Sequence, residues 1–215
     1  MDCAVLWDMD GVLVDTAELH YQTWKQTLAG YDIPFSRQLF YEFFGMNNEQ
    51  TLTGILGRPP EPSFLQELSD NKEDKFRKSI HGQVELYPGV RKLLQELQRA
   101  GVRQAIASSA PQENIDALVN ELNMASFFQA IVSGCELNSK PDPATFLLAA
   151  ERLGVNPQRC VVIEDALHGI EAARRAGMKC IAVATTHPVV LLSPADMVVK
   201  RITELSAARI LDLIN

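Results

Sequence analysis

Short apolar runs alternate with longer amphipathic segments along most of the chain, and this alternation predicts an α/β protein. The runs are short and almost wholly apolar, as expected of strands buried on both faces of a sheet. Strands that alternate with helices pair in parallel, so the pattern predicts a doubly wound parallel sheet of the Rossmann-like type. The predicted strands are residues 3–7, 103–107, 129–132, 160–164, 179–183 and, more weakly, 197–199.

Proline and glycine mark the ends of the helices between these strands, because proline suits a first helical turn and glycine suits the position after the last one. The predicted helices begin at Pro88 and stop at Gly101, begin at Pro111, begin at Pro143 and stop at Gly154, and span residues 167–176 before Gly177.

The segment between Asp15 and Tyr87 follows a different pattern, with no comparable strand run and with amphipathic spacing rich in Gln, Glu and Lys. It predicts an inserted helical domain with helices at 16–29, 37–44, 48–56 and 62–80. The expected division is a core formed by residues 1–15 and 85–215 and an inserted helical cap formed by residues 16–84.

Composition narrows the function classes. With 215 residues and 47% hydrophobic content, the chain can bury one large core or one domain that carries an insertion. The net charge of -7 argues against a nucleic-acid partner. The four cysteines are scattered, which indicates neither a zinc knuckle nor a redox dithiol. Without a signal peptide or a membrane span in the pattern, we expect a cytoplasmic protein with no membrane partner, as a monomer or weak homodimer.

Chemistry-bearing residues follow successive predicted strands, at the ends that converge on one edge of such a sheet. Taken singly, each has an ordinary explanation as a helix cap, a turn residue or a solvated charge. Together they offer a nucleophile, hydrogen-bond donors, a cation and carboxylates for a magnesium ion, which is the set that phosphoryl transfer needs. They are Asp8 and Asp10 after the first strand, Ser108 and Ser109 after the second, Lys140 after the third, and Glu164 and Asp165 at the end of the fourth.

These motifs, in this order, resemble those of the haloacid dehalogenase superfamily, and within it the β-phosphoglucomutase-like phosphatases and mutases. The resemblance covers essentially the whole chain. It is carried by Asp8-Met9-Asp10-Gly11, Ser108, Lys140-Pro141 and the run Val161-Val162-Ile163-Glu164-Asp165 with Gly169-Ile170-Glu171-Ala172-Ala173, and by an insertion where that group has its small helical cap.

The resemblance implies a role for each motif residue. Asp8 would attack the substrate phosphorus and become an aspartyl-phosphate, and Asp10 would act as general acid and then general base. Ser108 and Ser109 would bind the phosphoryl group, and Lys140 would neutralise charge on it. The cofactor would be Mg²⁺, bound by Asp8, Asp10, Glu164 and Asp165. The partner would be a small phosphorylated metabolite.

Two related chemistries fit the motifs less well. A dehalogenase uses an equivalent aspartate but needs neither the acid two residues later nor the metal-binding acidic pair. A phospho-receiver domain combines similar residues, but its phosphorylated aspartate lies on an inner strand and it lacks a helical insertion of this length. A non-catalytic binding protein remains the remote alternative.

Substrate choice should depend on the cap. Thr16, His20 and Trp24 share one helix face, and with Lys72 they resemble the cap residues of β-phosphoglucomutases. Packing of the cap is the plainer interpretation of His20 and Trp24.

The chain differs from the mutases in the cationic residues that bind a second phosphate there. The stretches that carry those cations in the mutases contain none here: residues 45–49 offer Asn48, and residues 109–112 offer Gln112. Lys72 and Arg58 are the remaining candidate cations of the cap. We therefore expect hydrolysis of a small phosphomonoester, with interconversion of β-glucose 1-phosphate and glucose 6-phosphate as the alternative.

Overall fold

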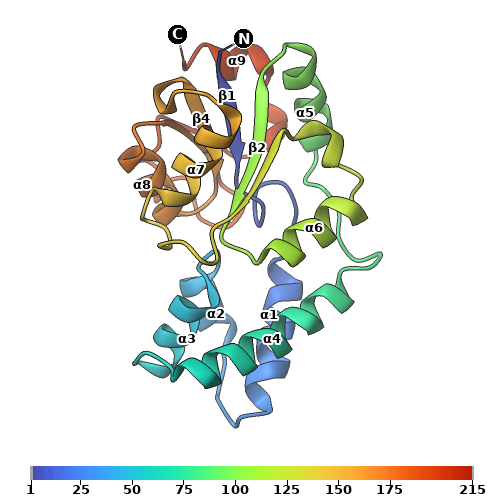
Figure 1. Cartoon of the computed structure of the whole chain (residues 1–215), viewed down its shortest axis with the longest axis vertical. Helices are drawn as coiled ribbons and strands as arrows, with labels where there is room; N and C mark the ends of the chain where they lie inside the picture. Colours follow the sequence, from blue (N-terminus) through green and yellow to red (C-terminus); the bar gives the residue numbers. More distant parts are fainter. Residues whose placement is uncertain (1, 215) are drawn as a thin grey trace.

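The computed structural model describes residues 2–214, and its central feature is a six-stranded sheet in which every pairing is parallel (Figure 1). The order β3-β2-β1-β4-β5-β6 puts β1 between β2 and β4, in the interior of the sheet. The predicted Rossmann-like α/β fold is confirmed. The strands are β1 (Ala4–Trp7), β2 (Arg103–Ser108), β3 (Ala130–Ser133), β4 (Cys160–Glu164), β5 (Lys179–Val183) and β6 (Met197–Val199).

Helices cover both faces of the sheet, and the strands are apolar on both faces for that reason. Successive residues of β1 point to opposite sides: Val5 and Trp7 enter one buried cluster, and Ala4 and Leu6 enter the other. The first cluster is completed by α5 (Val90–Arg99), α6 (Gln112–Glu121) and α9 (Ala207–Leu211). The second is completed by α7 (Ala144–Leu153) and α8 (Leu167–Arg175).

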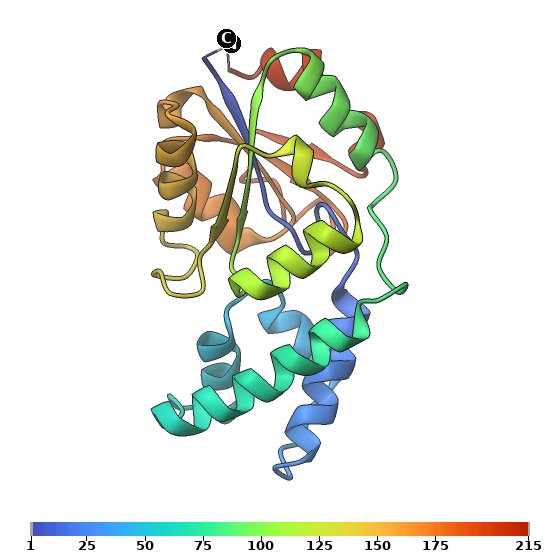
Figure 2. The same cartoon turned by 45° about the vertical axis from the view of Figure 1, so that its right-hand side comes forward.

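The four helices between β1 and α5 lie together beyond one end of the sheet, below it in Figures 1 and 2. They have an apolar cluster of their own, to which Tyr21, Trp24, Phe40 and Phe44 contribute aromatic rings. Because this cluster is separate from both sheet-facing cores, we propose that residues 16–84 form the cap domain. Its helices are α1 (Ala17–Ala29), α2 (Arg37–Phe43), α3 (Asn48–Leu56) and α4 (Pro62–Ser79).

The two chain crossings between the sheet and these helices lie side by side. Val14 pairs with Leu86 in an antiparallel bridge, and the Tyr87 amide donates to the Leu13 carbonyl at 3.0 Å. Paired crossings of this kind form a narrow connection, which suits a hinge.

The predicted elements differ from the observed ones mainly at their ends. The third strand runs from Ala130 to Ser133 rather than over residues 129–132. The sequence pattern did not predict α9 or the short 3₁₀ helices Ala125–Phe127, Pro157–Arg159 and Ile202–Glu204, because elements this short show no periodicity. No helix within residues 2–214 has both the length and the apolar character needed to cross a membrane.

Candidate active site

The carboxyl end of β1 places Asp8 and Asp10 at the edge of the sheet that faces the cap. The turn that follows depends on Gly11, whose φ of 86° lies in the left-handed region that favours glycine. A Cβ atom at Gly11 would also overlap the carboxylate of Asp165. Glycine therefore lets the turn after β1 approach the acidic residue that follows β4.

Lys140 joins the ends of β1 and β4. Its Nζ donates to Asp8 Oδ1 at 2.6 Å and to Glu164 Oε1 at 2.5 Å, and all three side chains are buried. Burial alone would lower the pKa of Lys140, but the charges of Asp8 and Glu164 raise it above its usual value. Lys140 is thus a fixed cation beside Asp8.

The Glu164 carboxylate is held through both oxygens. Oε1 accepts from Lys140, and Oε2 accepts from the backbone amides of Asp165 at 2.8 Å and Ala166 at 2.9 Å. A Cβ atom at Gly169, in the first turn of α8, would overlap this carboxylate. Gly169 therefore leaves room for the Glu164 side chain, which in turn orients Lys140.

Negative charge exceeds positive charge in this buried cluster, which contains Asp8, Glu164 and Asp165 but only one lysine. Burial raises the pKa of Asp8 to about 7 even though Lys140 lowers it. Burial, with the charges of Glu164 and Asp8, raises the pKa of Asp165 well above its usual range. A divalent cation would relieve this excess charge.

Within residues 2–214, no three His, Cys, Asp or Glu side chains lie in a metal-ligand arrangement. Magnesium does not require one, since it usually combines one or two carboxylates with water and substrate oxygens. The excess charge and the hard oxygen donors of Asp8 and Asp165 therefore fit a magnesium ion. Asp165 Oδ2 accepts a hydrogen bond from Thr186.

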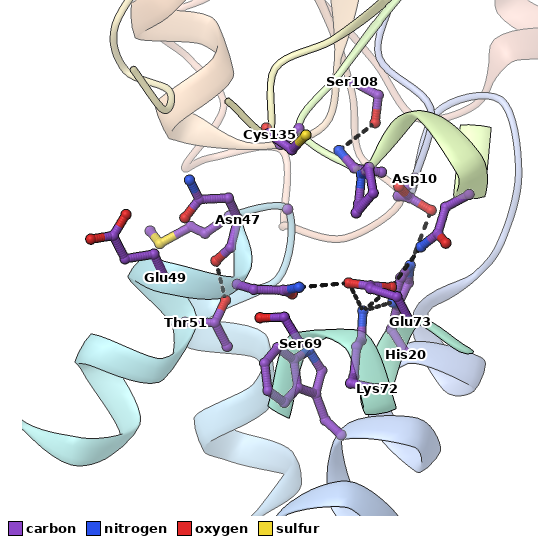
Figure 3. A pocket seen from close by; sticks show the side chains of 18 of the residues that line it. Asp10, His20, Asn47, Glu49, Thr51, Ser69, Lys72, Glu73, Ser108 and Cys135 are labelled. Carbon is purple, nitrogen blue, oxygen red and sulfur yellow. Dashed lines mark hydrogen bonds and ion pairs between the residues drawn. The ribbon is translucent and has the colours of Figure 1, made fainter. Parts of the chain in front are cut away.

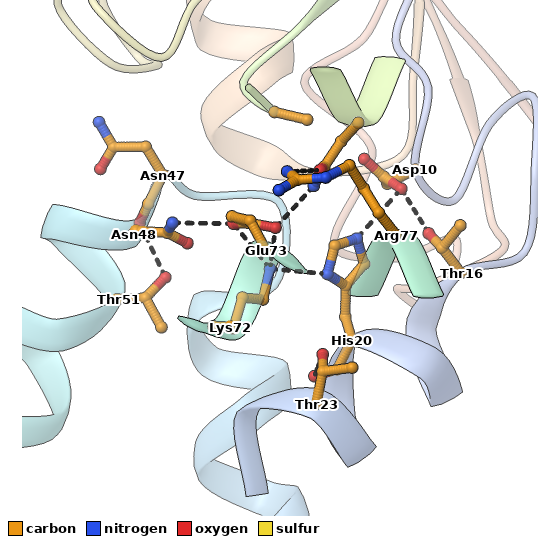
Figure 4. Close-up of polar contacts among 12 residues, drawn as sticks. Asp10, Thr16, His20, Thr23, Asn47, Asn48, Thr51, Lys72, Glu73 and Arg77 are labelled. Carbon is orange, nitrogen blue, oxygen red and sulfur yellow. Dashed lines mark hydrogen bonds and ion pairs between the residues drawn. The ribbon is translucent and has the colours of Figure 1, made fainter. Parts of the chain in front are cut away.

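Asp10 makes its contacts with the first cap helix (Figure 4). Thr16 Oγ1 donates to Asp10 Oδ1 at 2.5 Å, and His20 Nε2 lies 3.4 Å from the same oxygen. Burial would raise the pKa of Asp10, but these contacts and the charge of Lys72 together lower it. These contacts therefore favour the ionised form of Asp10.

Lys72 of α4 fixes the protonation pattern of His20. Its Nζ lies 3.0 Å from His20 Nδ1, and because an ammonium group can only donate, Nδ1 is the acceptor and Nε2 carries the proton toward Asp10. Burial and the Lys72 charge lower the pKa of His20, which keeps the ring neutral.

The same lysine belongs to a larger polar network between the cap and the core (Figures 3 and 4). Lys72 Nζ lies 3.0 and 3.1 Å from the two carboxylate oxygens of Glu73. Glu73 also accepts from Asn48 Nδ2 at 2.8 Å and from Asn114 Nδ2 at 2.6 Å. Asn114, on α6 of the core, accepts in turn from Arg77 Nη1 at 3.0 Å.

A cavity of 670 Å³ lies between the sheet edge and the cap. Asp8 and Asp10 line it from the core together with Ser108 and Ser109. Ser108 is buried, and its Oγ accepts from the Ala110 amide at 3.1 Å, which leaves its hydroxyl proton available to a ligand.

Four of the five predicted cap residues, His20, Trp24, Asn48 and Lys72, also line the cavity. The fifth, Thr16, is buried behind Asp10. Arg58 is exposed and lies outside the cavity lining.

Four polar residues of the site were not predicted. Glu73 and Arg77 follow Lys72 on α4, and their spacing of four puts them on one helix face, a signal that the sequence does contain. Thr186 follows β5, so tracing one more strand to its carboxyl end would have found it. Asn114 had no comparable signal, because its role depends on the approach of α4 to α6.

Comparisons with known proteins agree with this geometry. A family model described as haloacid dehalogenase-like hydrolase matches residues 5–183, which include every motif of the sheet edge. The chain belongs to this family. It is an enzyme of the haloacid dehalogenase type, in the β-phosphoglucomutase-like group.

Two relatives and one solved structure show the range of this group. The β-phosphoglucomutase of Bacillus subtilis is 35% identical over 211 residues, covering 94% of this chain and 91% of the relative. The phosphorylated carbohydrates phosphatase of Thermotoga maritima is 32% identical over 187 residues, covering 83% of both. The structure of CbbY from Rhodobacter sphaeroides in complex with xylulose-(1,5)bisphosphate has a TM-score of 0.88 and 28% identity, covering 98% of this chain and 99% of that one.

Proposed function

We propose that this haloacid dehalogenase-like enzyme is a magnesium-dependent phosphatase that hydrolyses a sugar phosphate through an aspartyl-phosphate on Asp8. The observation that carries the proposal is that the two carboxylates after β1 have different partners. Asp8 is bound to Lys140 of the core, whereas Asp10 is bound to Thr16 and His20 of the cap. A nucleophile and an acid-base group need such different surroundings.

In the first step, Asp8 forms a bond to phosphorus as the bond from phosphorus to the sugar oxygen breaks. Lys140 holds Asp8 Oδ1, so we assign the attack to Oδ2. Asp10 gives its proton to the departing sugar oxygen, and the hydroxyl of Ser108 donates to the phosphoryl group.

In the second step, a water molecule attacks the aspartyl-phosphate, and the bond between phosphorus and Asp8 breaks. Asp10 takes the proton from this water. The ionised form that Thr16 and His20 stabilise is the form that this step needs. Asp10 finishes the cycle protonated, as the acid that the next substrate requires.

Magnesium would be held by Asp8 and Asp165, with Asp10 contributing through its backbone, and Glu164 would add negative charge while orienting Lys140. When bound, magnesium supplies positive charge that stabilises the phosphoryl oxygens and keeps Asp8 ionised. The excess of buried carboxylates over cations supports this assignment.

The cavity supports a small substrate. Its 670 Å³ falls within the range of pockets that hold metabolite-sized ligands. The Thermotoga maritima relative is named for phosphorylated carbohydrates, which suggests the same substrate class for this chain.

The second candidate function is that of a phosphomutase, and the 35% identity to a β-phosphoglucomutase favours it. A mutase must hold the non-reacting phosphate with cations. Asn48 cannot neutralise such a group, and Lys72 is already paired with Glu73. These contacts favour hydrolysis.

A parallel assay separates the two candidates. Phosphate release is measured with magnesium from a panel of sugar monophosphates, beside a coupled assay for glucose 6-phosphate formed from β-glucose 1-phosphate with a trace of bisphosphate primer. We expect phosphate release that is lost in Asp8→Asn. Primer-dependent glucose 6-phosphate formation without phosphate release would establish the mutase instead.

A further inference from the structure

At the cap end of the cavity, neighbouring side chains already neutralise the charge of Lys72 and accept its hydrogen bonds. Lys72 is 3% exposed, and its three hydrogen-bond donors are matched by His20 Nδ1 and the two oxygens of Glu73. Its Nζ also lies 5.3 Å from the centre of the Trp24 ring. A ligand that reaches this end of the cavity therefore meets a neutralised cation.

Glu73 is fixed in place as a carboxylate. It is 5% exposed and accepts from Asn48 and Asn114 as well as from Lys72, so amide donors from α3 and α6 hold it from two sides. The amide groups of Asn48 and Asn114 that could serve an anionic ligand are thereby directed at Glu73.

Negative charges outnumber positive ones around the rest of the cavity. The lysine and arginine residues among the described lining residues are Lys72 and Arg77. Even without Asp8 and Asp10, the acidic residues of the lining outnumber them: Glu49, Asp70, Glu73, Asp74, Glu113 and Glu136. A phosphate dianion placed away from the sheet edge would be repelled by this surplus.

The cap also offers a group that suits a hydroxyl. Ser69 Oγ is buried without a hydrogen-bond partner in the described part of the chain, and Ser69 lies on the cap side of the cavity near Lys72 (Figure 3). An unpartnered buried hydroxyl can both donate and accept, so it matches the hydroxyl group of a sugar.

Building on the proposed function, we propose that Glu73 is a specificity-determining residue that limits the enzyme to monophosphates whose far end is neutral and rich in hydroxyl groups. It does so by neutralising Lys72 and by occupying the amides of Asn48 and Asn114. The substrate class is thus a sugar or sugar alcohol with one phosphate group.

The test compares kcat/KM for glucose 6-phosphate and glucose 1,6-bisphosphate in the wild type and in Glu73→Gln, which keeps the shape of the side chain and frees the Lys72 charge. We expect the wild type to prefer the monophosphate by about tenfold or more. In Glu73→Gln that ratio should fall by about tenfold, mainly through a lower KM for the bisphosphate. Glu67→Gln removes an exposed charge from the same helix outside the cavity lining and should leave the ratio within about twofold.

A wild type that uses the bisphosphate as well as the monophosphate would overturn the proposal, even if Glu73→Gln fails to fold. So would an equal loss on both substrates in Glu73→Gln, because that result indicates a purely structural role. If the wild type releases no phosphate from any sugar phosphate, the proposed function fails. Calorimetric binding of the same two ligands to the wild type would then still test the charge selection, with tighter binding of the bisphosphate as the contradicting result.

Discussion

Lys72 Nζ lies 3.0 Å from His20 Nδ1, and His20 Nε2 lies 3.4 Å from Asp10 Oδ1. The imidazole therefore connects a cap cation to Asp10, the proposed acid-base group of the core. Because the cap supplies both His20 and Lys72, the state of Asp10 depends on the position of the cap. Closure of the cap over the substrate would set the acid-base group at the same moment as it excludes water.

Replacing His20 should therefore impair proton transfer more than binding. We expect His20→Ala to lower kcat by about 10- to 100-fold with a smaller change in KM, and to shift the pH profile of kcat. His20→Gln, which can still donate to Asp10, should recover part of the loss. Steady-state kinetics over a pH series checks both variants, and a pure KM effect in His20→Ala would refute the positioning role.

The buried carboxylates make the free energy of unfolding depend on pH. With the pKa of Asp8 raised from 3.8 to about 7, the folded state keeps a proton that the unfolded state has lost between these values. The contribution of Asp8 to the free energy of unfolding should therefore fall as the pH rises through this window, by at most about 4 kcal/mol. The raised pKa of Asp165 acts in the same direction.

Magnesium competes with these protons, so we expect it to raise the melting temperature more at about pH 7.5 than at about pH 5.5. Asp8→Asn removes one of the titrating groups and should flatten the dependence in the absence of magnesium. Thermal denaturation with and without magnesium chloride measures both effects. Equal stabilisation at the two pH values would contradict a metal site at these carboxylates.

Lys140 should be as important for folding as for catalysis. Lys140→Met leaves Asp8 and Glu164 buried without their cation, and breaking a buried ion pair from one side costs about 3–5 kcal/mol. Lys179→Met, which removes a half-exposed lysine paired with Asp196, should cost no more than about 1 kcal/mol. Urea denaturation of the two variants provides the comparison, and similar losses would show that burial of the Lys140 pairs adds nothing.

The sheet edge was predictable because a parallel sheet brings its strand ends together whatever the details of the loops. Asp8, Ser108 and Glu164 end or directly follow predicted strands, so their meeting follows from the topology alone. The contacts of Glu73 with Asn48 and Asn114 were not predictable in this way. They depend on how α4 packs against α3 and against α6 of the core, and no periodicity in the sequence fixes that approach.

If Asp8 carries the phosphoryl group, the aspartyl-phosphate can be captured during turnover. Enzyme mixed with magnesium and a sugar monophosphate is quenched in acid within the first turnover, digested and examined by mass spectrometry. We predict a phosphoryl adduct on Asp8, and its loss in Asp8→Asn together with a fall in phosphate release of at least about a thousandfold. Phosphate release that persists in Asp8→Asn, or an adduct on another residue, would contradict the mechanism.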